Sequence, residues 1–365
     1  MSYTRVRYDG LKKMCDLVFE KFGFSTEDSR TITDVLLLSD LFGIESHGIQ
    51  RLVKYYSEIK QGLIIVDSKP KIIKETPVSA TLDGQAGMGQ LTGRTAMNMA
   101  IEKAEASGIG MVSVRNSNHY GIAGYYARMA EKKGLIGISM TNSPAVIVPT
   151  FGKEAMLGTN PIAISMPADP YPFLMDMATS VVTRGKVEVY NKRNEPLPDG
   201  WALDADGHDT TNPKDILYNV PRHLGGGIVP LGGSKELTGG HKGYGFALTV
   251  EMFTAILSGG LTGNYVHLDG KNGSGTCHYF CAIDYGMFGD KKSIENSFSK
   301  YLEELRNSKK AKDAVRIYTH GEKEVEAYND KMKNGIPVND STLHEIYDIC
   351  RYFDIDPENY VEKLN

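Results

Sequence analysis

VSATLDG, residues 78–84, opens the stretch that decides the fold, because apolar Val78, Ala80 and Leu82 alternate with polar neighbours. This is the period of a half-buried β-strand. The stretch continues to residue 141 as GRTAMNMAIEKAEASG, IGMVSV, GIAGYYARMAEKKG and LIGISMT, in which helix-like pieces alternate with short apolar runs. Alternating strands and helices predict an α/β body.

Helical patterns dominate both ends of the chain. Apolar residues recur at helical spacing in LKKMCDLVFEKF, and Ser25 precedes an acidic first turn, which predicts the start of a second helix. An amphipathic helix is expected from about Ser293 to Leu305, and another after Pro337. We therefore predict a helical domain formed by residues 1–75 with about 294–365, and an α/β domain at 76–293 that carries a polar excursion at about 191–240.

Charge and cysteine content restrict the class of protein. The 365 residues carry a net charge of -4, so there is no basic footprint for nucleic acid and no polybasic patch for a membrane. The N-terminus lacks a continuous apolar core of a signal peptide, and we expect an untargeted, cytoplasmic protein. Four cysteines are sparse for a disulfide framework and fit a reducing compartment.

Cys277, His278 and Cys281 could be interpreted as metal ligands. They alternate through the strand-like run CHYFCAID, however, and no second pair of ligands accompanies them. The pattern favours burial in a strand, and we predict no metal site.

Glu45-Ser46-His47-Gly48-Ile49-Gln50-Arg51 is the first candidate for a functional site. Gly43 is expected to end the preceding helix, and Ser46 is a plausible N-cap for the next one, which would place His47 and Arg51 on one face at i and i+4. A guanidinium can hold a carboxylate through two hydrogen bonds while a histidine exchanges a proton with the adjacent oxygen. Taken alone, the same residues favour a simpler interpretation, a capped helix start with a surface arginine.

A second histidine stands in the polar cluster Asn116-Ser117-Asn118-His119-Tyr120-Gly121, where a predicted strand ends. Polar groups at the end of a strand are a common location for catalytic side chains.

The usual nucleotide-binding fingerprints are absent. Gly108-Ile-Gly110 lacks the third glycine of G-x-G-x-x-G and lies inside a predicted strand, and Gly240-His241-Lys242-Gly243 lacks the spacing of a P-loop. Lys242 among glycines could meet a phosphate, or it could lie in a flexible surface loop. Asp176, at a strand end, could accept ribose hydroxyls or cap the helix expected after it.

Several segments together resemble one known family. They are DLFGIESHGIQRL, VRNSNHYGIAGYYA, GTNPIAISMPA, MDMATSVVTRGKV, PLPDGWALDADGHDTTNP, HKGYGFALTVEMFTAILSGG and HYFCAID, in order from Asp40 to Asp284. The chain resembles the malate/L-lactate dehydrogenase family without a Rossmann fold, whose relatives include ureidoglycolate, sulfolactate and diketogulonate oxidoreductases. The resemblance implies an α/β (α+β) fold with a mixed, largely antiparallel sheet flanked by helices, a homodimer, and hydride transfer between NAD(P)H and a 2-oxo acid.

The resemblance also implies roles for individual residues. His47 and His119 match active-site histidines, and Arg51 matches an arginine that holds the substrate carboxylate. Positions that match cofactor contacts are Ser143, Asp176, Met177, Ala178, Lys242 and Gly243. Near the C-terminus the family has Pro-Gly-Glu where this chain has His320-Gly321-Glu322, which leaves Gly321 and Glu322 to carry that contact.

The resulting hypothesis is a dehydrogenase that interconverts a 2-hydroxy acid and a 2-oxo acid, with malate and oxaloacetate as the leading pair and NAD favoured over NADP. We favour His119 as the acid/base, with Ser46 and His47 orienting the substrate, although the two histidines could exchange roles. The open alternatives are lactate, ureidoglycolate or sulfolactate as substrate, reduction of a cyclic imino acid, and a sensor that binds NAD(P)H without turnover.

Overall fold

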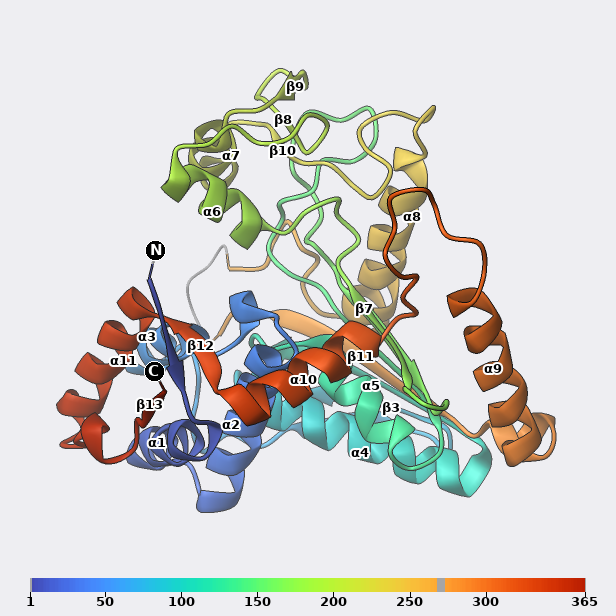
Figure 1. Cartoon of the computed structure of the whole chain (residues 1–365), viewed down its shortest axis with the longest axis horizontal. Coiled ribbons are helices and arrows are strands. Elements are labelled where there is room, and N and C mark those ends of the chain that lie inside the picture. The colour runs from blue at the N-terminus through green and yellow to red at the C-terminus, as the bar shows by residue number, and fades with distance from the viewer. Residues whose placement is uncertain (1, 268–272, 365) are drawn as a thin grey trace.

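A seven-stranded mixed sheet forms the centre of the molecule (Figure 1). The computed structural model describes residues 2–267 and 273–364. The strand order is β2-β3-β4-β11-β5-β6-β7, and β3 and β4 are the one parallel pair among the described neighbours. The strands span Lys71–Glu75 (β2), Ser79–Asp83 (β3), Ile109–Ser117 (β4), Ile136–Thr141 (β5), Ile162–Met166 (β6), Phe173–Met177 (β7) and Thr276–Ile283 (β11). The predicted mixed, largely antiparallel sheet is confirmed.

Helices cover both faces of this sheet. Apolar side chains of α4 (Gly89–Ser107) and α5 (Ala123–Glu131) share one core with β4 and β11. On the opposite face, α8 (Gly240–Glu251) continues into the π-helical turn η3 (Met252–Ile256), and Val250 and Phe253 pack against residues of β5 and β11. The central strand comes from a distant part of the sequence. Strand β11 lies between β4 and β5 and is antiparallel to both.

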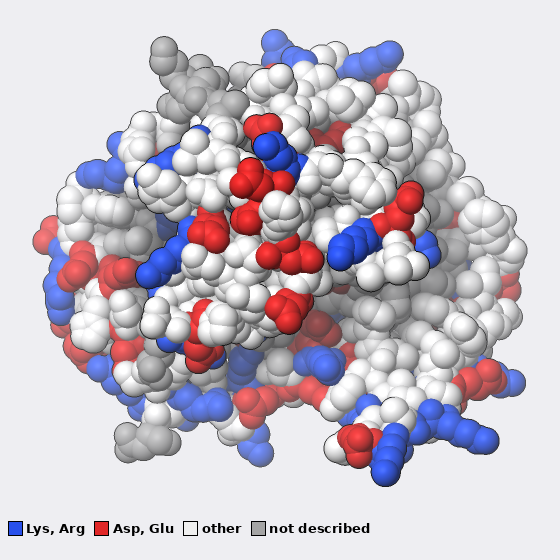
Figure 2. Space-filling model, turned by 90° about the horizontal axis from the view of Figure 1, so that it is seen from above, with Lys and Arg blue, Asp and Glu red and all other residues white. Residues whose placement is uncertain are grey.

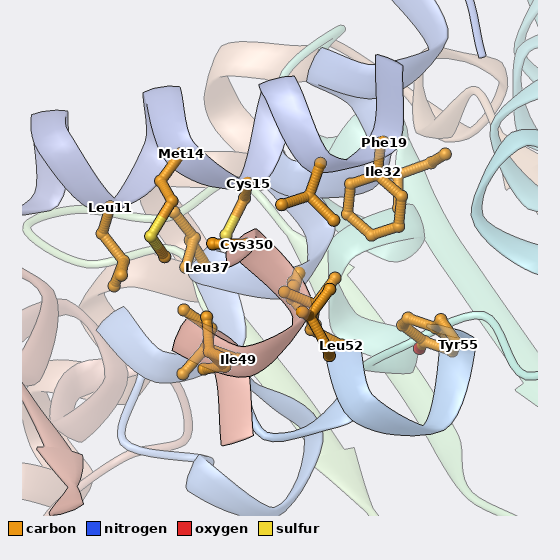
Figure 3. Close-up of a cluster of buried hydrophobic side chains, with 14 of the residues drawn as sticks. Leu11, Met14, Cys15, Phe19, Ile32, Leu37, Ile49, Leu52, Tyr55 and Cys350 are labelled. Carbon is orange, nitrogen blue, oxygen red and sulfur yellow. The ribbon is translucent and has the colours of Figure 1, made fainter. Parts of the chain in front are cut away.

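The N- and C-terminal segments share a second core, part of which is shown in Figure 3. Cys15 and Cys350 lie close together in it, although they come from opposite ends of the chain (Figure 3). The helices concerned are α1 (Tyr8–Lys21), α2 (Thr26–Leu41), α3 (Arg51–Lys60) and α11 (Asp340–Tyr352), with α10 (Glu322–Asn334) against α2. A small sheet, in the order β12-β1-β13, also joins the two ends through Ile336–Asn339, Tyr3–Val6 and Lys363–Leu364.

Helix α9 (Lys291–Arg306) matches the predicted amphipathic helix but packs elsewhere. None of its described residues belongs to the terminal core, and Phe298 instead lies against Phe173 of β7, with ring centroids 5.7 Å apart. The division into domains at about residues 75 and 294 stays a prediction.

The polar excursion forms a small lobe above the sheet (Figure 1). Its core contains Val187, Leu197 and Ile216, and Trp201 packs edge-on against Tyr190. The elements are α6 (Arg184–Arg193), β8 (Ala202–Leu203), β9 (Asp209–Thr210), α7 (Pro213–Asn219), η2 (Val220–Arg222) and β10 (Gly227–Ile228). Two further short helical turns are η4 (Tyr285–Phe288) and η5 (Pro357–Asn359).

Acidic and basic side chains are interspersed on the face shown in Figure 2, and neither sign covers it. Among the described residues, no helix combines the length and the apolar character needed to cross a bilayer.

The turn between α2 and α3 is held by one buried carboxyl group. Oδ2 of Asp40 accepts a hydrogen bond of 2.7 Å from the backbone N–H of Ile49, and Lys331 of α10 donates to the Asp40 carbonyl at 2.8 Å. Gly48 passes so close that a Cβ atom there would lie 1.9 Å from Oδ1 of Asp40. The turn is therefore fixed from the α2 side.

This turn corrects the predicted N-cap. Gly43 does end the preceding helix, with φ 84°, and Ser25 does cap α2 by accepting from the N–H of Asp28. Ser46, however, lies in the 3₁₀ turn η1 (Glu45–His47), and α3 begins only at Arg51. The physical reason is the bond from Ile49 to Asp40, which draws the chain away from a helical path.

We predict that Gly48→Ala lowers the free energy of unfolding by about 2–3 kcal/mol, because the added methyl group must displace the Asp40 carboxyl group. Urea titration followed by circular dichroism measures the change. Gly245→Ala is the matched control, since open space surrounds that position in α8 and alanine favours a helix. Equal stability of Gly48→Ala and wild type would show that the turn adapts to a side chain. It would also show that the close approach of Gly48 to Asp40 does not matter for stability.

Candidate active site

Two histidines from distant parts of the chain meet face to face. His47 ends η1, and His119 follows β4; their ring centroids are 5.4 Å apart and the rings are stacked at 29°. The structure thus brings together the two histidines that the sequence singled out separately.

Each imidazole is oriented through its Nδ1 atom. Nδ1 of His47 lies 2.9 Å from the hydroxyl of Ser46, and Nδ1 of His119 lies 2.7 Å from the hydroxyl of Tyr55. No described residue hydrogen-bonds Nε2 of either ring. Nε2 of both histidines can therefore interact with a bound molecule.

Both histidines are neutral at pH 7 in the absence of an anion. Burial, followed by the positive charges of Arg51 and Lys54, lowers the pKa of His47 to about 4. The pKa of His119 is also held well below its usual range, by burial and then by Lys54, His47 and Arg51. A bound anion would offset these charges and favour protonation.

Arg51 lies beside the pair at the start of α3. Its Nε donates a 2.6 Å hydrogen bond to the Ser46 carbonyl, which ties the guanidinium to the turn that carries His47. The predicted proximity of His47 and Arg51 is confirmed, but the turn produces it instead of one continuous helix.

Sequence reasoning missed two residues of α3 that approach the site. Tyr55 is fully buried at the edge of the terminal core (Figure 3), and its hydroxyl reaches His119. Lys54 stands one residue earlier and is close enough to depress the pKa of both histidines. The available signal was helical spacing, because these residues follow Arg51 by three and four positions.

Three of the predicted cofactor segments lie side by side. The hydroxyl of Ser143 accepts from the N–H of Thr159 at 3.0 Å, and the Thr159 carbonyl accepts from the N–H of Thr179 at 2.9 Å. The N–H of Leu231 in turn donates to the Thr179 carbonyl at 3.0 Å. Gly243 packs against Leu231, where a Cβ would lie 2.3 Å from the Leu231 oxygen. The strip thus joins Ser143, the segment after β7 and the start of α8.

A buried network supports this strip. Glu251 of α8 accepts hydrogen bonds from the side-chain amides of Asn142 and Asn160, at 3.2 and 3.0 Å, and from the N–H of Gly263 at 3.2 Å. The two asparagines lie next to Ser143 and Thr159 in sequence, so their hydrogen bonds fix the loops that carry the strip.

Asp176 links the strip to the histidine segment. It lies in β7, and its Oδ2 accepts from the N–H of Gly124, the second residue of α5, at 2.7 Å. Burial raises the pKa of Asp176 to about 6. Asp176 does not cap the helix expected after it, since the chain stays extended and α6 begins only at Arg184. Met177 and Ala178 lie half-buried at the strand end.

The other predicted cofactor contacts are Lys242, Gly321 and Glu322, and they lie outside the strip described above. Lys242 is exposed in the first turn of α8. Gly321 lies against the start of β7, where a Cβ would be 2.4 Å from the Pro172 oxygen. The carboxylate of Glu322 is buried and engaged by Arg306, Arg316 and the N–H of Thr319, so the structure gives it a role in holding the start of α10. Its cofactor contact stays a prediction.

The cysteines follow the strand interpretation. Cys277 and Cys281 are buried in β11, as predicted. Within residues 2–267 and 273–364, no three His, Cys, Asp or Glu side chains gather in a way that could hold a metal ion.

Comparison with known proteins gives the class. Residues 6–347 match the family described as malate/L-lactate dehydrogenase. Malate dehydrogenase of Pyrococcus abyssi is 46% identical over 350 residues, covering 96% of this chain and 95% of that protein. L-sulfolactate dehydrogenase of Methanocaldococcus jannaschii is 38% identical, covering 96% and 98%. The crystal structure of malate dehydrogenase from Entamoeba histolytica has a TM-score of 0.94 at 37% identity, covering 97% and 99%.

Fold, paired histidines and relatives together define an oxidoreductase that acts on CH–OH donors and uses a nicotinamide cofactor. The chain belongs to the malate/L-lactate dehydrogenase family, and it is a hydroxy acid dehydrogenase.

The lowered histidine pKa values predict a loss of stability in acid. Between pH 6.5 and about 4 the unfolded chain binds a proton at His47 that the folded protein does not, so the free energy of unfolding falls as the pH falls. Each such histidine contributes a slope of at most about 1.4 kcal/mol per pH unit.

Urea unfolding at pH 7, 6 and 5 measures this slope. We expect His47→Gln to flatten it relative to wild type, and His344→Gln, at an exposed position of α11, is the control for replacing a histidine elsewhere. Parallel pH profiles for wild type and His47→Gln would contradict a neutral His47.

Proposed function

We propose that this protein interconverts malate and oxaloacetate with NAD as the cofactor. The observation that carries the proposal is the His47–His119 pair beside Arg51. Relatives named malate dehydrogenase support the choice of substrate, and no Rossmann acidic residue argues for or against NADP.

In the proposed mechanism the substrate carboxylate binds the guanidinium of Arg51, and its C2 oxygen lies between the Nε2 atoms of the two histidines. In reduction, negative charge develops on that oxygen, and hydrogen-bond donors aimed at it stabilise the transition state. In oxidation, a neutral imidazole removes the hydroxyl proton.

The sequence favoured His119 as the acid/base, but the structure supports the reverse assignment. Burial and the neighbouring cations lower the pKa of both histidines, so the hydroxyl partner of each ring is what distinguishes them. The Tyr55 hydroxyl can donate to Nδ1 of His119, which leaves Nε2–H as a fixed donor toward the substrate oxygen. We therefore assign proton transfer to His47, oriented by Ser46, and polarisation of the oxygen to His119.

The bound nicotinamide would supply or accept the hydride at C2. The residues proposed to hold the nicotinamide cofactor are Ser143, Asp176–Ala178 and Gly243. At Gly243 the chain passes Leu231 too closely for a side chain. Lys242, at the exposed start of α8, could meet a phosphate together with backbone N–H groups. Gly321 and Glu322 complete the proposed set from the far end of β7.

The alternatives of the same family are lactate, ureidoglycolate or sulfolactate oxidation and reduction of a cyclic imino acid. A sensor that binds NAD(P)H without turnover is the non-enzymatic alternative. The oriented histidine pair disfavours the sensor, because binding alone does not need two imidazoles with free Nε2 atoms.

The test measures loss of NADH absorbance with oxaloacetate, pyruvate, sulfopyruvate and a cyclic imino acid, and repeats the panel with NADPH. We expect fastest turnover of oxaloacetate with NADH. His47→Ala should lower kcat by about a hundred- to ten-thousand-fold, and His119→Ala should lower it less. NADH binding without turnover of any compound would favour the sensor, and a larger loss for His119→Ala would restore the opposite assignment.

A homodimer and a reducing cytoplasm are part of the same proposal. The four cysteines are free and buried. Support for a dimer comes from an apolar face of α8 and η3 that no described residue covers, formed by Phe246, Leu248, Met252, Ile256 and Leu257.

We predict that Ile256→Asp, at a position 62% exposed, converts a dimer to a monomer, because a charge would be buried in the interface. Sedimentation velocity measures the mass, and Val315→Asp, at an exposed apolar residue between α9 and α10, is the control. An unchanged dimer would place the interface elsewhere.

A further inference from the structure

A cavity of about 550 Å³ lies between α1, α2, α5 and α10, which are labelled in Figure 1. Its described lining residues include neither histidine of the pair, nor Arg51, nor any residue of the strip. Binding sites for small molecules have volumes of roughly 300–1,000 Å³ and are mostly apolar, with a few polar groups that orient the ligand. The cavity therefore has the size of a site for a small molecule other than the substrate.

Four aromatic rings line this cavity. They come from all four helices or their ends: Tyr8 of α1, Phe42 directly after α2, Tyr125 of α5 and Tyr328 of α10. Phe42 and Tyr328 meet edge to face, with ring centroids 6.4 Å apart. Phe42 is buried, whereas Tyr328 stays 36% exposed. Such walls favour an aromatic ligand, because stacked and edge-on ring pairs stabilise beyond the area that they bury.

Arg128 of α5 brings a positive charge to the same cavity, and the outer end of its side chain is free. The guanidinium lies over the Phe42 ring, with Cζ 5.4 Å from the centroid, and the side chain is only 20% exposed. Its Nε donates to Oε2 of Glu131 at 3.3 Å, whereas no described residue accepts a hydrogen bond from Nη1 or Nη2. Two guanidinium nitrogens can hold one carboxylate through parallel hydrogen bonds.

The other charged residues of the lining favour an anion over a cation. Asp34, the acidic residue of the lining, is already paired with Lys12 at 2.9 Å. Lys132 follows Arg128 by four positions at the end of α5, and no acidic side chain among the described residues lies within ion-pair distance of it. Residues four apart on a helix are neighbours. Arg128 and Lys132 thus give the cavity a net positive charge.

The walls of the cavity also belong to elements that hold the active-site histidines. Phe42 lies two residues after Asp40, whose carboxyl group fixes the turn that carries His47. Phe42 also shares a small apolar core with Ile122, three residues after His119. A ligand in the cavity would therefore contact chain that leads to both histidines.

We propose that this cavity is a second ligand site, which binds an aromatic monocarboxylate. The carboxylate lies on the terminal nitrogens of Arg128, close to Lys132, and the ring lies among the four aromatic side chains. The proposal does not rest on the proposed function, because the two sites share no lining residue.

Isothermal titration calorimetry with indole-3-propionate tests the site. This compound has an aromatic ring and a carboxylate, but it has no hydroxyl or oxo group at C2 that the enzyme could oxidise or reduce. We expect saturable binding of one molecule per chain, with a Kd in the micromolar to millimolar range. The neutral indole-3-propionamide should bind at least about tenfold more weakly, because it offers no charge to the guanidinium.

Substitutions of the lining locate the binding. Arg128→Gln should raise the Kd of indole-3-propionate about ten- to a hundredfold, because the charged hydrogen bonds are lost. Tyr328→Ala should raise it about three- to tenfold, because one aromatic wall is removed. Lys133→Gln is the matched control, since Lys133 is exposed beside Lys132 but does not line the cavity, and its Kd should equal that of wild type. Circular dichroism checks that each variant is folded, and Lys132→Gln is a second variant that removes charge.

Arg51→Lys separates the two sites, because Arg51 is also proposed to hold a carboxylate. Binding that is retained in Arg51→Lys and weakened in Arg128→Gln supports the second site. Three results would overturn it: no saturable binding to wild type at millimolar concentration, equal affinity for the acid and its amide, or binding that is lost in Arg51→Lys and unchanged in Arg128→Gln.

Discussion

The hydrogen bond from the Ile49 N–H to the buried carboxyl group of Asp40 is the constraint on which the site depends. It fixes the short turn between α2 and α3, and this turn carries Ser46 and His47 on one side and leads into Arg51 on the other. The apolar residues next to it, Ile49 and Leu52, anchor the turn in the core shared by the two chain ends (Figure 3). Residues of the N- and C-terminal segments thus serve chemistry whose other half lies on the central sheet.

The site combines burial with an excess of positive charge. In water an imidazole would be partly protonated near neutrality, whereas burial and the neighbouring cations keep both histidines neutral here. In the proposed mechanism the neutral histidines favour oxidation, and bound substrate anions shift the site toward reduction. Substrate binding and proton transfer would then be coupled through electrostatics.

Local patterns in the sequence predicted much of the fold, because strands 79–83 and 109–117 and the helices beside them carry their periodicity within a few residues. The order of the sheet could not be predicted locally, since β11 pairs with strands more than a hundred residues earlier. The N-caps illustrate the same limit. Ser25 caps its helix as predicted, whereas Ser46 does not, because a carboxyl group on a different helix binds the following turn.

The site was predicted in part for similar reasons. His47, His119 and Arg51 stand in segments that resemble a family, and the structure brings them together. Tyr55 and Lys54 have no such signal, because a tyrosine and a lysine at these positions are also typical of the buried and solvent-facing sides of an ordinary helix. Only the tertiary contact with His119 distinguishes Tyr55 from other core aromatics.

The central position of β11 also has a consequence for how the protein is made. Biosynthesis delivers β4 and β5 well before residues 276–283, so the middle of the sheet stays open while the ribosome adds more than a hundred residues. The exposed edges of β4 and β5 are then available to other chains, and aggregation competes with folding during this interval. His119, which lies two residues after β4, reaches its final surroundings only when that late strand arrives, so the nascent chain cannot become active before residues 276–283 have been made.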